Sequence, residues 1–116
     1  PTVVRVKTVR LLNAHRYQVV LAEDGLDAEQ QIENSAPDVL VTDVDMPGID
    51  GLELVRRVRR NPRTANLPII LVTSDSEQLR ASAAATGVDV VLGKPYPEEQ
   101  LIHHIQQLLL AQASAR

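Results

Sequence analysis

The chain has 116 residues, of which 44% are hydrophobic and 23% charged, a composition that excludes a disordered protein and fits one globular domain over residues 1–116. No apolar run approaches the length of about 20 residues that a membrane-spanning helix needs, and the net charge of −3 gives no reason to expect nucleic acid or an anionic membrane as a partner. Cysteine is absent, which permits a reducing, cytoplasmic setting.

Short segments rich in β-branched residues alternate with segments of helical period along the chain. The expected strands are residues 1–4, 18–22, 38–43, 67–74 and 88–94. The clearest helices are residues 51–60 and 97–112. This alternation is typical of βα units around a parallel sheet, and the nearly continuous Val, Ile and Leu content predicts strands covered on both faces. The sequence therefore predicts an α/β fold: an open, doubly wound, five-stranded parallel sheet with about five helices.

The helical segment 51–60, "GLELVRRVRR", is amphipathic. Its predicted buried face carries Leu52, Val55 and Val58. The opposite face carries four arginines, at positions 56, 57, 59 and 60. We interpret the arginines as a solvated helix face and not as a nucleic-acid patch, because the whole chain is acidic.

Three apolar strands end in polar residues of different chemistry. Residues 39–43 end in Asp43, residues 69–74 end in Thr73 and Ser74, and residues 90–94 end in Lys94. The carboxyl ends of parallel strands lie at one edge of a sheet, where open α/β sheets bind their ligands. We therefore expect a carboxylate, a hydroxyl and an ammonium group to meet there, with Asp45 close by.

Such a set of groups suits phosphoryl transfer. A carboxylate can attack phosphorus and form an acyl phosphate. A lysine and a hydroxyl donor stabilise the charge on the phosphoryl oxygens, and Mg²⁺ held by oxygen ligands neutralises further charge. Each residue alone also has a structural explanation: Asp43 as a helix cap or turn residue, Thr73 as a hydroxyl at a sheet edge and Lys94 as a surface charge. Their joint occurrence at three strand ends favours function.

The segments "PDVLVTDVDMPGIDGLEL", "PIILVTS" and "GVDVVLGKPY" resemble the signature segments of response-regulator receiver domains, the phosphoacceptor modules of two-component signalling. The chain is most similar to receivers attached to chemotaxis-type hybrid histidine kinases. The resemblance implies a flavodoxin-like fold in the cytoplasm. It also implies a histidine kinase or phosphotransfer domain as the phosphodonor, and a domain that is not a turnover enzyme.

The resemblance also implies a role for each matching residue. Asp43 would accept the phosphoryl group and bind Mg²⁺, to which Asp45 would add its backbone carbonyl. Thr73 and Lys94 would hold phosphoryl oxygens, and the Lys94–Pro95 peptide bond would be cis. Asp45 and Asp75 would tune dephosphorylation. The resemblance leaves Asp50 as a structural residue of the loop.

Two features depart from the family pattern. The aromatic switch residue expected three positions before the lysine is replaced by Val91, and Thr73 would have to act without it. The acidic pair expected at the end of the first strand, which completes the metal site, is absent, because no Asp or Glu precedes Glu23.

The part of the chain that lacks the acidic pair is also shorter than the fold requires. The residues before Gln18 are too few for a strand, a loop, a helix and a second loop. We therefore hypothesise that a segment with the acidic pair is missing between Val3 and Lys7, most simply after Val3.

Two other functions remain open from the sequence. One is a degenerate pseudo-receiver, which would keep the fold and bind partners without being phosphorylated. The other is a phosphatase of the haloacid dehalogenase type, which also uses an Asp nucleophile in a D-x-D run followed by Thr or Ser and Lys. The phosphatase fits less well, because residues 93–101, "GKPYPEEQL", contain no aspartate to complete its metal site.

Overall fold

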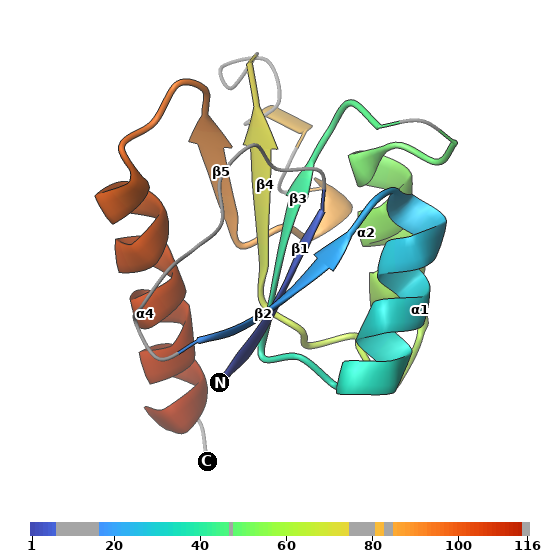
Figure 1. Cartoon of the computed structure of the whole chain (residues 1–116), viewed down its shortest axis with the longest axis horizontal. Helices are drawn as coiled ribbons and strands as arrows, with labels where there is room; N and C mark the ends of the chain where they lie inside the picture. Colours follow the sequence, from blue (N-terminus) through green and yellow to red (C-terminus); the bar gives the residue numbers. More distant parts are fainter. Residues whose placement is uncertain (7–16, 47, 75–80, 83–84, 115–116) are drawn as a thin grey trace.

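The chain forms one parallel sheet with helices on both faces (Figure 1). The computed structural model describes residues 1–6, 17–46, 48–74, 81–82 and 85–114. Its strands, in chain order, are β1 (Thr2–Val6), β2 (Gln18–Ala22), β3 (Val39–Asp43), β4 (Ile69–Thr73) and β5 (Val90–Gly93). They lie side by side in the order β2-β1-β3-β4-β5, and every neighbouring pair is parallel. The predicted doubly wound, five-stranded α/β fold is confirmed.

Three complete helices cover this sheet within the described residues. They are α1 (Gly25–Ser35), α2 (Gly51–Arg60) and α4 (Glu98–Ser114). Helices α1 and α2 pack on one face of the sheet and α4 packs on the other (Figure 1). Strands β3 and β4 are buried along their whole length, as expected of strands covered on both sides.

Aspartate side chains fix the starts of α1 and α2. The Asp24 carboxylate accepts a hydrogen bond of 2.8 Å from the Asp27 backbone N–H, and Asp50 accepts one of 2.8 Å from the Glu53 N–H. Each bond satisfies a backbone donor that has no partner inside the helix. Both caps follow strands β2 and β3, so the two helices begin at the same edge of the sheet.

The predicted helices and faces need three corrections. The expected total of about five helices exceeds the three complete ones, and the described residues 81–82 and 85–86 are helical as well. The fully buried leucine of α2 is Leu54, whereas Leu52 is only partly buried, because the helix presents residues 51, 54, 55 and 58 to the sheet. Arg59 does not lie on a solvated face; its side chain is only 20% exposed and binds neighbouring loops.

Strand β1 runs from Thr2 to Val6 and pairs with β2 on one side and β3 on the other. Residues 7–16 lie outside the described part of the chain. The segment hypothesised to be missing between Val3 and Lys7 therefore stays a prediction.

The order of the strands determines where a ligand can approach. The chain passes from β1 outward to β2 and then returns to the other side of β1 to form β3. The strand order therefore reverses between β1 and β3. Open sheets bind their ligands at the carboxyl edge beside such a reversal. Among the described residues no helix is long and apolar enough to cross a membrane.

Candidate functional site

Asp43 is the last residue of β3 and lies at this carboxyl edge. Its side chain is 11% exposed, although aspartate is rarely buried unless a charge or hydrogen bonds stabilise it. The backbone behind it is tightly packed, because a Cβ atom on Gly51 would overlap the carbonyl oxygen of Asp43. The start of α2 therefore contacts the backbone of Asp43 directly and fixes its position.

Lys94 provides the charge that opposes Asp43. Its Nζ lies 2.5 Å from Asp43 Oδ1, and its side chain is 48% exposed. Oδ1 accepts no hydrogen bond of good geometry from the described residues, so the contact is an ion pair and not an aligned hydrogen bond. The site thus contains a buried carboxylate oxygen paired with the ammonium group of a half-exposed lysine side chain.

Thr73 completes the group of three strand ends. It is the last residue of β4 and is 5% exposed. Its carbonyl accepts a hydrogen bond of 2.8 Å from the backbone N–H of Lys94. In the register of β3 with β4, Asp43 pairs with Val72, so Thr73 lies one residue further along the neighbouring strand. The three predicted residues therefore lie at one edge, at the ends of three adjacent strands.

The loop after Asp43 leads directly into α2. Asp45 is exposed. Asp50, predicted only as a structural residue of the loop, caps α2. Gly48 has a backbone φ of +79°, a conformation that glycine adopts without the steric cost of a side chain. This loop keeps Asp45 at the rim of the site.

The remaining predicted residues have different outcomes. The Lys94–Pro95 peptide bond is cis, as expected. Val91 is a half-buried residue of β5 that pairs with Leu71. Asp75, predicted to tune dephosphorylation, lies outside the described residues.

Arg5 and Tyr96 are not among the site residues predicted from the sequence. Arg5 lies in β1 and is only 4% exposed; its Nη2 donates a hydrogen bond of 3.4 Å to the Tyr96 hydroxyl, and its Nη1 has no hydrogen-bond partner among the described residues. Arg5 pairs with Val41, two residues before Asp43, and so belongs to the same face of the sheet as Asp43. One arginine inside the apolar run "TVVRV" was the signal that could have drawn attention to it.

The described residues do not assemble a complete metal site. No group of three or more His, Cys, Asp or Glu side chains lies close enough together among them to bind a metal ion. Asp43 and Asp45 are the predicted oxygen ligands at this edge, and the end of β1, where the acidic pair is expected, supplies Arg5 and Val6. Mg²⁺ demands nearly octahedral oxygen coordination, so this set alone does not fit it.

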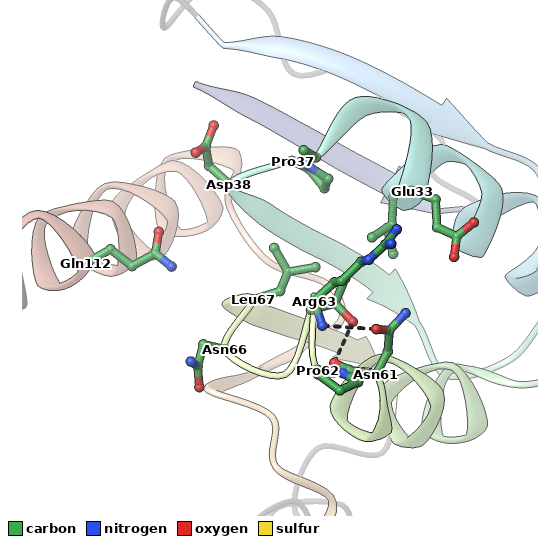
Figure 2. A pocket seen from close by; sticks show the side chains of 12 residues that line it. Glu33, Pro37, Asp38, Asn61, Pro62, Arg63, Asn66, Leu67 and Gln112 are labelled. Atoms are coloured by element: carbon green, nitrogen blue, oxygen red, sulfur yellow. Dashed lines mark hydrogen bonds between the residues drawn. The ribbon is translucent and has the colours of Figure 1, made fainter.

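A separate cavity of about 360 Å³ lies at the opposite, amino-terminal end of the sheet (Figure 2). It is lined by the end of α1, the residues before β3 and the turn after α2, including Glu33, Asp38, Arg63 and Leu67. None of the predicted site residues lines it. The cavity is therefore distinct from the carboxyl edge where Asp43, Thr73 and Lys94 lie.

Comparisons with known proteins show the family of the chain. Residues 2–106 match the family model of the response regulator receiver domain. The response regulator MprA of Mycobacterium leprae (strain TN) is 39% identical over 107 residues, which are 91% of this chain and 46% of MprA. The phosphate regulon transcriptional regulatory protein PhoB of Rhizobium meliloti (strain 1021) is 35% identical over 99 residues, 84% of this chain and 44% of PhoB. The chain thus spans less than half the length of these relatives.

Solved structures show the same fold. A response regulator described as putative, from Chloroflexus aurantiacus J-10-fl, superposes with a TM-score of 0.80 at 29% identity and covers 94% of this chain and 97% of its own. The receiver domain of the Francisella response regulator 1452 gives a TM-score of 0.83 at 24% identity, with coverages of 97% and 98%. From its sequence, its strand order and the three residues at its carboxyl edge, we conclude that the chain belongs to the response regulator receiver domain family.

Proposed function

We propose that this receiver domain accepts a phosphoryl group on Asp43 from a histidine kinase or phosphotransfer domain and then changes a partner-binding surface. The observation that carries the proposal is the buried Asp43 carboxylate, paired with Lys94 beside the end of β4. The domain accepts and loses its own phosphoryl group and is not a turnover enzyme. We place it in the cytoplasm, where histidine kinases present their phosphorylated residues.

In the proposed transfer, a carboxylate oxygen of Asp43 attacks the phosphorus atom of a phosphohistidine. A P–O bond forms, the P–N bond of the donor breaks, and its electron pair stays on the imidazole nitrogen. Lys94 would move from the carboxylate to a phosphoryl oxygen, and the Thr73 hydroxyl would donate to another. Asp45 and Asp75 would then control access of water to the acyl phosphate.

Mg²⁺ belongs to this proposal but needs ligands beyond the described ones. The receiver domain of the sensor histidine kinase PA1611 from Pseudomonas aeruginosa PAO1 shares the fold, with a TM-score of 0.78 at 23% identity over 93% of this chain and 96% of its own. That domain was solved with a magnesium ion coordinated in its active-site cleft. When bound here, Mg²⁺ would neutralise charge between Asp43 and the phosphoryl group, and the Asp45 carbonyl would be one of its ligands.

We further propose that the acidic pair required for Mg²⁺ lies in a segment between Val3 and Lys7 that the 116-residue sequence does not contain. Two observations support this segment. Arg5 is buried, and its Nη1 has no hydrogen-bond partner in the described part of the chain; an unpaired buried charge typically costs several kcal/mol. Only residues 7–17 connect β1 to β2, whereas a parallel crossover usually needs about a dozen residues or more.

The second candidate function is the pseudo-receiver, a binding module that is not phosphorylated. The sequence before Glu23 favours it, because this part contains no acidic side chain. Strand β1 instead places Arg5 on the same face of the sheet as Asp43. In this case residues 7–17 form the whole connection from β1 to β2, and Asp43 remains paired with Lys94.

Intact-mass measurement during incubation with Mg²⁺ and a small acyl phosphate distinguishes these functions. We expect a transient gain of one phosphoryl group, which is lost in Asp43→Ala and in samples with excess chelator. Asp50→Ala is the matched control, because it removes a carboxylate of the same loop that only caps α2. A gain in Asp43→Ala would refute the assignment of the acceptor, and no gain in the unmodified protein would favour the pseudo-receiver.

The same spectra test the missing segment before any reagent is added. A starting mass above the one calculated from the 116 residues supports the segment, and peptide mapping then places the extra residues between Val3 and Lys7. A mass equal to the calculated one refutes it.

A further inference from the structure

The only sulfur atom of the chain lies in the loop that follows Asp43. The sequence contains no cysteine and one methionine, Met46, three residues after Asp43. Met46 is half-buried and packs against the apolar cluster between the sheet and helices α1 and α2. Asp45, before it, and Gly48, after it, are both exposed, so solvent reaches the loop on either side of Met46. A reagent that attacks sulfur therefore acts at this loop.

The Met46 sulfur is coupled to the backbone of Asp43 through one buried hydroxyl group. Thr42 is fully buried, and its hydroxyl lies 3.0 Å from the Asp43 carbonyl oxygen and 3.6 Å from Met46 Sδ. A hydroxyl has one hydrogen to donate, so these two acceptors share it. The same carbonyl touches the start of α2, where a Cβ atom on Gly51 would overlap it. A change at the sulfur therefore acts on the groups that position Asp43.

Oxygen transfer to the thioether would change these contacts. Methionine sulfoxide is polar and chiral, whereas the methionine side chain is apolar and flexible. A thioether sulfur is a weak hydrogen-bond acceptor. The sulfoxide oxygen carries a partial negative charge and accepts more strongly, so it would compete with the Asp43 carbonyl for the Thr42 hydroxyl. Oxidation of Met46 thus weakens the packing of the loop against the apolar cluster and removes a hydrogen bond from the Asp43 backbone.

We infer that Met46 is a site of reversible oxidation by hydroperoxides, and that its sulfoxide slows phosphoryl transfer to Asp43. The sulfur lone pair attacks one peroxide oxygen, and the O–O bond breaks. The hydrogen on the attacked oxygen passes to the departing oxygen, which leaves as water or an alcohol. The sulfur is oxidised by two electrons and the peroxide is reduced. The effect on Asp43 rests on the proposed function, but the oxidation and its effect on packing do not.

Intact-mass measurement after incubation with hydrogen peroxide tests the site. The folded protein should gain one oxygen atom, which peptide fragmentation places on Met46, and Met46→Leu should gain none. Stereospecific methionine sulfoxide reductases with a thiol reductant should restore the starting mass. The inference is overturned if the folded protein gains no oxygen under conditions that fully oxidise the urea-unfolded chain, because the sulfur is then closed to the reagent.

The rate of phosphoryl gain tests the consequence for Asp43. After the peroxide is removed, the oxidised protein with Mg²⁺ and an acyl phosphate should gain its phosphoryl group roughly 10-fold more slowly, because small displacements of positioned groups reduce rates strongly. The reductases should restore the rate. Met46→Leu is the matched control: its side chain has a similar volume but no sulfur, so its rate should be the same with and without peroxide treatment. An unchanged rate in the oxidised protein would refute the effect on Asp43.

Thr42→Val tests the coupling through the buried hydroxyl. The variant keeps a β-branched side chain of similar shape and lacks the donor. Oxidation should lower the urea midpoint of the unmodified protein. It should lower the midpoint of Thr42→Val further, because the sulfoxide oxygen then receives no hydrogen bond from residue 42 and remains poorly satisfied against the apolar cluster. Equal falls in the two proteins would exclude this coupling.

These measurements separate the inference from the proposed function. If the unmodified protein gains no phosphoryl group before oxidation, the proposed function fails and the urea midpoint decides. A fall on oxidation that the reductases reverse then supports the inference, and an unchanged midpoint overturns it. If the phosphoryl group is gained at the same rate before and after oxidation, the proposed function stands and the inference fails.

Discussion

Arg59 joins three separate parts of the fold, and its removal should destabilise the domain far more than the solvated helix face predicted from the sequence suggests. Its Nε donates to the Gly87 carbonyl at 2.9 Å, and its Nη1 donates to the carbonyls of Ala65 and Leu67 at 3.0 and 2.7 Å. Its Nη2 contacts Asp89 Oδ2 at 3.2 Å. The guanidinium group thus links the end of α2 to the loops that enter β4 and β5.

The expected loss follows from these four bonds. Hydrogen bonds to charged groups contribute roughly 1.5–3 kcal/mol each. Water replaces part of this here, because Arg59 is 20% and Asp89 41% exposed, and a charge pair this accessible contributes little. We therefore expect Arg59→Ala to lower the free energy of unfolding by about 2–4 kcal/mol. Arg59→Lys, which keeps the charge but cannot reach all four acceptors, should lose about half as much.

Urea unfolding followed by circular dichroism measures this loss. With a slope of about 1–3 kcal/mol per molar urea, the midpoint should fall by about 1–2 M in Arg59→Ala. Arg60→Ala is the matched control: it is the next residue of the same helix, its side chain is 69% exposed, and it should cost less than about 0.5 kcal/mol. A loss in Arg59→Ala no larger than in Arg60→Ala would refute the reasoning.

Three further predictions concern the start of α2 and its ion pairs. Gly51→Ala should destabilise the domain by about 1–3 kcal/mol, because the new Cβ overlaps the Asp43 carbonyl, and should slow phosphoryl gain in the mass assay; an unchanged urea midpoint would contradict this. Asp50→Ala should cost about 1 kcal/mol in the same assay through loss of the helix cap, whereas Asp50→Ser should restore most of it. The hydrogen bond from Arg57 holds the pKa of Glu53 below its ordinary value of 4.5. The stabilisation by Glu53 is therefore fully present above pH 4.5 and is lost as the pH falls through the lowered pKa of the folded state. The difference in free energy of unfolding between the unmodified protein and Glu53→Gln should shrink over that pH range. A difference that stays constant from pH 7 to pH 3 would contradict this prediction.

The local features were predictable from the sequence because they depend on near neighbours in the chain. The residues of α2 were predicted with their observed bounds, since the segment 51–60 carries apolar residues at helical spacing. Asp43, Thr73 and Lys94 were found because each ends an apolar strand, and parallel strands place such ends at one edge. What the sequence did not predict were contacts between segments far apart in the chain, such as Arg59 with Gly87 and Asp89.

By itself the sequence determined the α/β class, the family and the three residues that meet at the carboxyl edge. Only the tertiary structure decided which partners these residues have: the ion pair of Lys94 with Asp43, its backbone bond to Thr73 and the packing of Tyr96 beneath α4. Hydrophobic periodicity and the ends of strands can be recognised from consecutive residues. Side-chain pairing instead depends on strand order and register, and these are fixed by the packing of the whole sheet against its helices.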